Sequence, residues 1–326
     1  MANRLASVRH RKGSVLILTY HSVLDEPDPM RPSAPTVEVF ESQMTVLADE
    51  FNVLPLADAV AGLENGRLPP AAVVVTFDDG YADNHRNALP ILRKLDLPAT
   101  FFIATSYLDG GCMFNDCLIE AARAAPSGSW DTGVAPVSEV KLDSLADRLA
   151  VAGRLIEAVK YQPLERRKSR VEGLLDRLGM ARPTDLMMTS GQVRDLHSAG
   201  MTIGAHTYAH PILARLDAAE SREEITRGRE ELQAMVGGQV DLFAYPNGQP
   251  KRDYLWRDVE ILKRLGFNGA VSTAWGIATA GADSLQLPRL GFPAARDGDF
   301  FMRLARARAG SPGHLLGPHG SAGKLL

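Results

Sequence analysis

Short apolar runs alternate with amphipathic stretches along most of this chain, and the pattern predicts its main elements. Residues 15–20 form one apolar run, and Phe40, Met44 and Leu47 then recur with helical spacing. This predicts a strand followed by a helix at about residues 38–50. We predict further strands at about residues 51–54, 73–77, 99–104, 201–205, 240–244, 269–272 and 285–290. We predict further helices at about residues 56–64, 84–95, 190–199, 218–236, 254–265 and 297–308. Such alternation is typical of an α/β sheet or barrel with parallel strands.

The alternation breaks off in the middle of the chain, between residues 110 and 183. No run there reads as a buried strand, and two segments have the spacing of charged amphipathic helices. Loops are predicted at 127–129 and 132–133, and helices at 139–160 and 164–179. The charges of the second helix are expected to form a solvated face: Glu165, Arg166, Arg167, Lys168 and Arg170. We therefore predict a helical insertion at about residues 110–185.

The two ends of the chain differ in composition from the part between them. Residues 1–12 form a basic tail without the apolar core of a signal peptide, and residues 310–326 are expected to be disordered. His314 and His319 lie in the second tail and are discounted as ligands. One catalytic domain is predicted between the tails, at residues 13–309. Since no apolar run approaches the roughly 18 residues of a membrane span, a cytoplasmic location is expected.

Composition and charge bear on the class of protein. The chain of 326 residues has 45% hydrophobic and 23% charged residues, which is ordinary for a soluble globular protein. Its formal net charge of −3 provides no global basic field, so a nucleic-acid partner is not expected. Cys112 and Cys117 provide neither a disulfide framework nor a Cys-x-x-Cys metal site. We expect both to be small buried hydrophobes.

Two adjacent carboxylates, Asp78 and Asp79, follow the strand predicted at residues 73–77 and precede Gly80. Two acids at the end of a buried strand are costly unless a metal ion or a proton transfer uses their charge. Ligands of α/β folds also bind at the carboxyl ends of strands. The alternative is a polar turn in which Asp79 and Gly80 only close the strand.

A pair of histidines, His206 and His210, follows the strand predicted at residues 201–205. Histidines four residues apart can face the same way on one helical turn and bind one metal ion, although such a pair can also be structural or exposed. Together with Asp79 they would provide three protein ligands and leave an open position for water. This is the pattern of a hydrolytic zinc site.

These two motifs resemble the polysaccharide deacetylase family, also called the NodB-homology family or carbohydrate esterase family 4. The resemblance rests on Thr76-Phe77-Asp78-Asp79-Gly80 and on His206-Thr207-x-x-His210. Residues 97–102 and 200–204 extend it, so that it spans most of about 15–105 and 185–295.

The resemblance implies a distorted (β/α)7-type barrel and a metal-dependent removal of N- or O-linked acetyl groups. Asp79, His206 and His210 match the metal ligands of the family, and Asp78 matches its catalytic base. Zinc is the expected ion, but cobalt and nickel accept the same ligands.

One family motif, Arg-x-Pro-Tyr, corresponds here to a loop in which Ala244 replaces the arginine. That arginine usually orients the catalytic aspartate, so another residue must do so or the role is lost. Arg289, in a late strand, can supply the charge, or it is a surface arginine. In the same loop the backbone N–H of Asn247 is the candidate donor to the oxyanion, and Tyr245 is a candidate substrate contact.

The late Leu-x-His motif, which supplies the general acid in the family, is also missing. The early strand instead ends in Thr19-Tyr20-His21-Ser22, which resembles the branch of the poly-N-acetylglucosamine deacetylases. In that branch a Tyr-His motif near the N-terminus supplies the acid. We therefore assign His21 as general acid, since imidazoles titrate near neutral pH, with a structural or substrate-binding histidine as the alternative.

Three further residues are candidates for substrate binding. Asp116 follows a predicted strand and either lines the pocket or caps a helix. Tyr81 and Trp275 can stack on a sugar ring, or they belong to the core or the rim.

Three functions remain open. The first is deacetylation of a saccharide or a sugar-containing intermediate, and a cytoplasmic location favours a precursor over a finished polymer. The second is hydrolysis of a C–N bond in a small non-sugar amide. The third is carbohydrate binding without catalysis, which the presence of the complete set of predicted catalytic and metal-binding residues argues against. The oligomeric state does not follow from the sequence.

Overall fold

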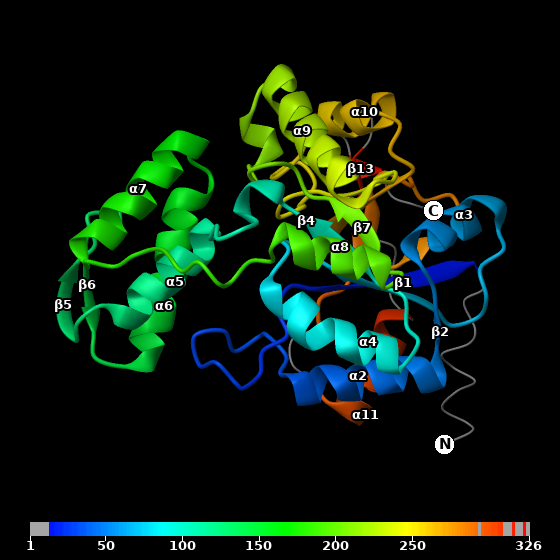
Figure 1. The fold of residues 1–326 in the computed structure, drawn as a ribbon, viewed down its shortest axis with the longest axis horizontal. Helices are drawn as coiled ribbons and strands as arrows, with labels where there is room; N and C mark the ends of the chain where they lie inside the picture. Colours follow the sequence, from blue (N-terminus) through cyan, green and yellow to red (C-terminus); the bar gives the residue numbers. More distant parts are fainter. Residues whose placement is uncertain (1–12, 293–294, 309–314, 317–321, 324–326) are drawn as a thin grey trace.

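A sheet of nine strands forms the centre of the computed structural model, which describes residues 13–292, 295–308, 315–316 and 322–323 (Figure 1). The strands of this sheet are β1 (Ser14–Tyr20), β2 (Asn52–Val53), β3 (Ala72–Phe77), β4 (Thr100–Ile103), β7 (Thr202–Ala205), β8 (Leu242–Ala244), β9 (Gly269–Trp275), β10 (Ala278–Thr279) and β11 (Leu287–Arg289).

Seven of these strands follow one another in parallel, in the order β1, β3, β4, β7, β8, β9 and β11. The last strand returns to the first through Leu290, which forms a parallel bridge with Leu18. In this bridge the Thr19 N–H donates to the Leu290 carbonyl (3.0 Å), and the Leu290 N–H donates to the Ile17 carbonyl (2.8 Å). The sheet is thus nearly closed into a distorted (β/α) barrel, and the predicted fold class is confirmed.

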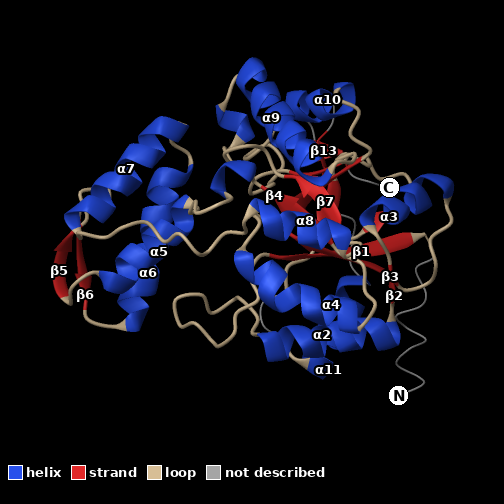
Figure 2. Ribbon diagram, in the orientation of Figure 1, coloured by secondary structure: helices blue, strands red, loops and turns tan. Residues whose placement is uncertain are grey.

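Helices surround this barrel, with α2, α4 and α11 at the bottom of the view, α9 and α10 at the top and α8 in front of the sheet between them (Figures 1 and 2). The helices of the barrel are α2 (Val37–Glu50), α3 (Leu56–Asn65), the π-helix η1 (Asn84–Ala88), α4 (Leu89–Lys94), the 3₁₀-helices η2 (Thr105–Tyr107) and η3 (Leu213–Arg215), α8 (Ser190–Ser198), α9 (Ala218–Val236), α10 (Trp256–Arg264) and α11 (Asp297–Arg308). The single helix predicted at 84–95 is wrong in its first half. Pro90 has no N–H for the usual helical bond, and the turn before it has π geometry.

Alternation along the strands decides which side chains enter the barrel. On β3, Val74 packs in one cluster with Ile17, Val271 and residues of α3. Side chains two positions apart share a face, so Thr76 and then Asp78 follow Val74 on the inner side. On β11, Leu287 belongs to the same cluster, and Arg289 follows it on that side. Polar groups of β3 and β11 therefore meet at the carboxyl end of the barrel.

The insertion has its own small core and lies beside the barrel, at the left of Figure 1. Its elements are α5 (Phe114–Ala124), β5 (Gly128–Asp131), β6 (Glu139–Leu142), α6 (Leu145–Lys160) and α7 (Leu164–Arg177). Cys112 and Cys117 are free and buried in this core.

Two predictions for the insertion are wrong. β5 and β6 form an antiparallel pair where the sequence predicted a loop and the start of a helix. Val140 and Leu142 are buried while Glu139 and Lys141 are exposed, and this strand pattern is too short to be recognised beside the helical spacing that follows. The bounds of the helix α5 were not predicted, although Asp116 was considered as a helix cap.

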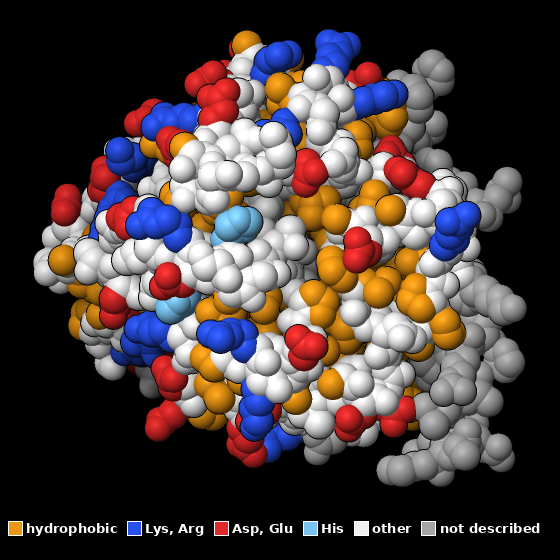
Figure 3. Space-filling view, turned by 45° about the vertical axis from the view of Figure 1, so that its right-hand side comes forward, with side chains coloured by type: hydrophobic (Ala, Val, Ile, Leu, Met, Phe, Trp, Pro, Cys, Tyr) orange, Lys and Arg blue, Asp and Glu red, His pale blue; other side chains and the backbone are white. Residues whose placement is uncertain are grey.

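The tails are described only in part. β12 (Leu315–Leu316) pairs with β13 (Ala322–Gly323), whereas residues 1–12 and most of the second tail, with His314 and His319, lie outside the described residues. Over the part of the chain that the structure describes, no helix combines the length and apolar character needed to cross a membrane. On the face drawn in Figure 3, basic and acidic side chains are interspersed, so neither sign dominates that face.

Candidate active site

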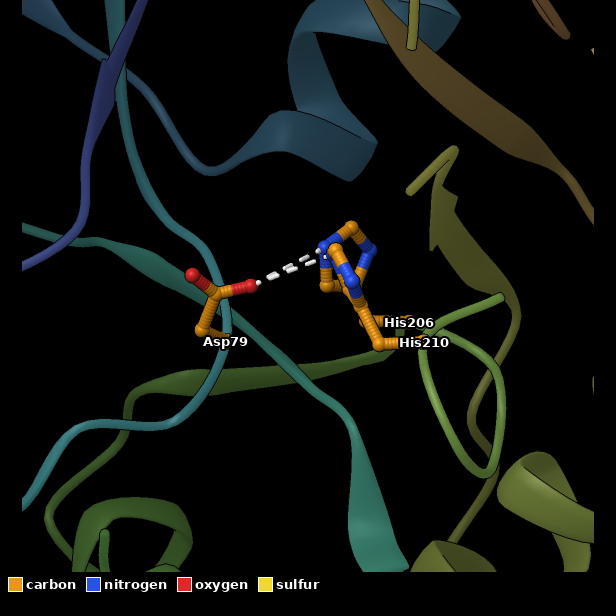
Figure 4. Close-up of side chains that lie close together, drawn as sticks. All are labelled: Asp79, His206 and His210. Carbon is orange, nitrogen blue, oxygen red and sulfur yellow. Dashed lines mark ion pairs between the residues drawn. The ribbon is translucent and has the colours of Figure 1, made fainter. Parts of the chain in front are cut away.

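Three side chains from two loops converge at the carboxyl end of the barrel. Asp79 follows β3, and its carboxylate points at the imidazoles of His206 and His210, which follow β7 (Figure 4). Asp79 Oδ1 lies 3.4 Å from the Nε2 atom of each histidine, and all three side chains are buried. The sharp turn that aims Asp79 requires positive φ angles, 77° at Asp79 and 95° at Gly80, and glycine adopts such angles without strain.

The donor atoms of this group fit a divalent metal ion. One carboxylate oxygen and two imidazole nitrogens are ligands that zinc and similar ions accept. Bonds of about 2.0–2.1 Å in tetrahedral geometry would separate two ligand atoms by roughly 3.4 Å, which matches the observed spacing from Asp79 to each histidine. Burial lowers the pKa of His210 to about 3, so its imidazole is neutral and its lone pair is available.

The sequence analysis placed the two histidines on one helical turn. In the structure they lie in a loop. Thr207 and His210 have positive φ angles of 64° and 50°, which break any helix. The loop is held from inside by Thr207, whose Oγ1 accepts the His210 N–H (3.1 Å). It is held from outside by Glu224 of α9, whose backbone and side-chain oxygens accept the N–H groups of Tyr208 and Ala209. Gly228 of α9 allows this contact, since a Cβ there would lie 2.5 Å from the Thr207 carbonyl oxygen.

The tautomer of His206 is set by the strand that carries the altered motif. Its Nδ1–H donates to the backbone carbonyl of Ala244 (2.7 Å), so Nε2 keeps its lone pair toward Asp79.

Arg289 crosses the barrel interior to Asp78. Its Nη1 donates to Asp78 Oδ1 (2.7 Å) and its Nη2 to Asp78 Oδ2 (2.6 Å), while Nη1 also donates to Thr76 Oγ1 (3.1 Å). The Arg289 Nε–H donates to the carbonyl of Ser272 (3.0 Å). Burial alone would raise the pKa of Asp78, but the charge and hydrogen bonds of Arg289 lower it, so this carboxyl is ionised. Arg289 is thus buried and paired, not a surface arginine.

Asp78, Asp79, His206 and His210 line one cavity of about 800 Å³, within the range of roughly 300–1,000 Å³ typical of small-ligand sites. His21 lines this cavity from the end of β1 and is exposed to it, and Asn247 lines it with a φ of 58°. Tyr81 and Asp116 form part of the wall, where the Tyr81 hydroxyl donates to Asp116 Oδ2 (2.8 Å). Asp116 lies in the first turn of α5, whose N-cap is Met113, so it is not the cap.

The sequence of the chain matches a family model with the description Polysaccharide deacetylase over residues 65–270. The chain belongs to the polysaccharide deacetylase family. It is also 27% identical over 140 residues to a poly-beta-1,6-N-acetyl-D-glucosamine N-deacetylase of Staphylococcus epidermidis. That match covers 38% of this chain and 48% of the relative, so the chain spans about half the length of the relative.

Two solved structures share the fold of this polysaccharide deacetylase family member. The deacetylase PplD of Streptococcus pyogenes, in complex with acetate, has a TM-score of 0.60 and 20% identity, covering 90% of this chain and 99% of PplD. IcaB from Ammonifex degensii has a TM-score of 0.58 and 19% identity, covering 91% of this chain and 98% of IcaB. At these identities the two structures support the fold alone.

Two candidate substrate contacts of this family member lie outside the cavity wall. Tyr245 is wrong as a substrate contact, because it is fully buried, stacks on Tyr254 and donates its hydroxyl to the Leu285 carbonyl (2.9 Å). The sequence does not indicate that this end of β8 points away from the cavity. Trp275 is 62% exposed and packs edge-on against Phe292, which lines the cavity, so Trp275 lies outside the ring of lining residues.

One residue of the site, Arg167 of α7, was predicted to be solvated and is 3% exposed. Its guanidinium lies over the Phe114 ring (4.4 Å), and its Nη2 donates to the carbonyls of His210 (3.3 Å) and Ala209 (3.5 Å). The insertion therefore touches the metal-ligand loop through Arg167. The charge run around Arg167 hid this contact, although helical spacing places Val171 and Leu174, which are buried, on the same face.

Proposed function

We propose that this protein is a metal-dependent hydrolase that removes an acetyl group, linked through nitrogen or oxygen, from a saccharide or a sugar-containing intermediate. The observation that carries the proposal is the buried ion pair of Asp78 and Arg289 beside the group formed by Asp79, His206 and His210. Asp78, Asp79 and both histidines line one cavity. Membership of the polysaccharide deacetylase family and the similarity to a named N-deacetylase support the same reaction.

A divalent ion held by Asp79, His206 and His210 would supply Lewis-acid polarisation of the acetyl carbonyl and of the attacking water. Zinc is the ion we propose, with cobalt and nickel as alternatives because they accept the same donors.

The remaining steps belong to the side chains. Asp78 takes the proton of the attacking water, and Arg289 orients its carboxylate and keeps it ionised. The backbone N–H of Asn247 donates to the oxyanion that develops on the substrate carbonyl. His21, which directly follows β1 and lines the cavity, donates a proton to the leaving nitrogen or oxygen.

The test is acetate release by the metal-loaded protein from a panel of acetylated sugars and one small non-sugar amide, with and without a chelator. The proposal predicts release from sugars that the chelator abolishes, and a large loss of turnover in His21→Ala with bound metal unchanged. Hydrolysis of the non-sugar amide alone would favour a general C–N hydrolase. Sugar binding without acetate release would favour a binding protein. The cytoplasmic location stays a prediction, which fractionation of cells would test.

A further inference from the structure

We propose that the wall of the cavity formed by the insertion and by the loop after β8 binds an anionic group, phosphate or carboxylate, on the acetylated substrate. This inference rests on the proposed function and specifies the substrate further. The residues concerned are Lys160 and Tyr161 at the end of α6 and Arg252 and Asp253 after β8, all of which line the same cavity as Asp79 and the two histidines.

Three cations surround the ring of Tyr161. The Lys160 ammonium lies 5.6 Å from the ring centroid, the Arg252 guanidinium 4.9 Å and the Arg215 guanidinium 5.4 Å. The ring is fixed in place because its hydroxyl donates to Asp253 Oδ1 (3.0 Å). Asp253 is itself buried, and its Oδ2 accepts the Gln249 N–H (3.0 Å). The cations therefore gather around a rigid platform and not around a mobile loop tip.

The charges of this cluster are not balanced. Within the described part of the chain, neither Lys160 nor Arg215 forms an ion pair. Arg252 reaches Glu157 at 3.5 Å, but both side chains are more than half exposed, and such pairs contribute little. Three cations thus face two carboxylates, Glu157 and Asp253, and like charges this close repel one another.

The acidic groups elsewhere in the cavity are already engaged. Asp78 pairs with Arg289, and Asp116 accepts hydrogen bonds from Tyr81 and from Arg31. Arg31 also lines the cavity, but it pairs with three carboxylates at once, those of Asp28, Asp116 and Glu120. Excess positive charge is therefore confined to the wall around Tyr161.

An anion on the substrate would relieve this repulsion. Arginine binds phosphate and carboxylate through paired hydrogen bonds, and lysine binds them as a point charge. Because this wall and the group that would hold the metal share one cavity, a substrate with its acetyl group at Asp79 could place a neighbouring phosphate or carboxylate against Lys160 and Arg252. A neutral acetylated sugar would leave the cluster unused.

The experiment compares three substrates with the metal-loaded protein: N-acetylglucosamine, N-acetylglucosamine 1-phosphate, and N-acetylglucosamine linked to a hexuronic acid. Two measurements are made, the kinetics of acetate release and binding by calorimetry. We expect at least one anionic substrate to show a KM and a Kd about tenfold lower than the neutral sugar, with similar kcat. The substrate that shows the preference identifies phosphate or carboxylate as the group bound.

The variants Lys160→Gln and Arg252→Gln, alone and combined, should remove this preference and leave the neutral sugar unaffected. Lys168→Gln, an exposed lysine on α7, serves as the control and should behave as wild type. Equal affinity for all three compounds, or a preference that survives in the double variant, would overturn the anionic subsite. Preferential binding of the anion without any acetate release would contradict the proposed function and still support the subsite.

Discussion

Arg289 and Asp78 lie 211 positions apart in the sequence and meet inside the barrel through two parallel hydrogen bonds of 2.7 and 2.6 Å. Arginine is replaced by Ala244 at the position where the family motif normally places it, yet Asp78 still has a guanidinium partner. The partner comes from β11, the strand that closes the barrel next to β1. In this chain the positive charge beside Asp78 therefore comes from β11, and its two hydrogen bonds fix the orientation of the carboxylate.

Removal of the Arg289 guanidinium should remove turnover. In Arg289→Met, Asp78 loses both hydrogen bonds, so we expect kcat to fall by about 100-fold or more while bound metal stays near wild type. Arg289→Lys keeps the positive charge but not the two paired hydrogen bonds, so its kcat should lie between those of wild type and Arg289→Met. Acetate release and metal analysis on the same preparations provide the measurement. Near-normal turnover in Arg289→Met would contradict the assigned role.

Arg167 should support metal binding from the insertion. His210 Nδ1 has no hydrogen-bond partner among the described residues, so its loop depends on backbone contacts, including those from Arg167. We expect Arg167→Met to weaken metal binding by about 10- to 100-fold in calorimetric titrations, an effect typical of residues that support metal ligands. Arg166→Met, an exposed neighbour on the same helix, is the matched control. Equal affinity in the two variants would show that Arg167 has no such role.

Gly228 should be required for the position of the histidine loop. A Cβ in Gly228→Ala would lie 2.5 Å from the Thr207 carbonyl oxygen, and neither backbone can move without shifting the loop. We expect a lower melting temperature and weaker metal binding. Gly173→Ala is the control: a Cβ there meets no atom within 4 Å, so the same change should stabilise α7 by up to about 1 kcal/mol. If both variants bind metal as wild type does, close packing against α9 is not what positions the loop.

Asp83 should make the protein less stable as the pH rises. Burial raises the pKa of Asp83 to about 7, whereas an aspartate in the unfolded chain titrates near 4. Between these values the folded protein holds a proton that the unfolded chain has released, so the free energy of unfolding falls with rising pH. We expect urea denaturation in chelator to show a loss of about 1–2 kcal/mol between pH 5.5 and 8, absent in Asp83→Asn. The same loss in both proteins would assign it to other groups.

Features carried by local pattern were predictable from the sequence. The helix at 218–236 was predicted with its observed ends, because Asp217 caps its first turn and Gly237 takes the left-handed conformation after its last. The alternation of strands and helices indicated a parallel α/β sheet or barrel, and the family resemblance implied the distorted barrel. Asp79, His206 and His210 were found because each follows the carboxyl end of a strand, where side chains from different strands meet.

Features set by packing between distant segments were not predictable in this way. Arg167 looks like any other charge in its helix until α7 is docked on the histidine loop. The Tyr245 side chain points away from the cavity because of how the chain turns after β8. The β5–β6 pair depends on a core formed only within the insertion. The sequence suggested Arg289 as a source of charge, but its contact with Asp78 requires the barrel to close.

The most direct test of the account separates the two neighbouring aspartates. Asp78→Asn removes the base and leaves Asp79, His206 and His210 in place, so the metal content and the acetate release of one preparation are compared with wild type. We predict wild-type metal content with acetate release reduced to background. Loss of the metal in Asp78→Asn, or acetate release close to that of wild type, would contradict the division of roles between Asp78 and Asp79.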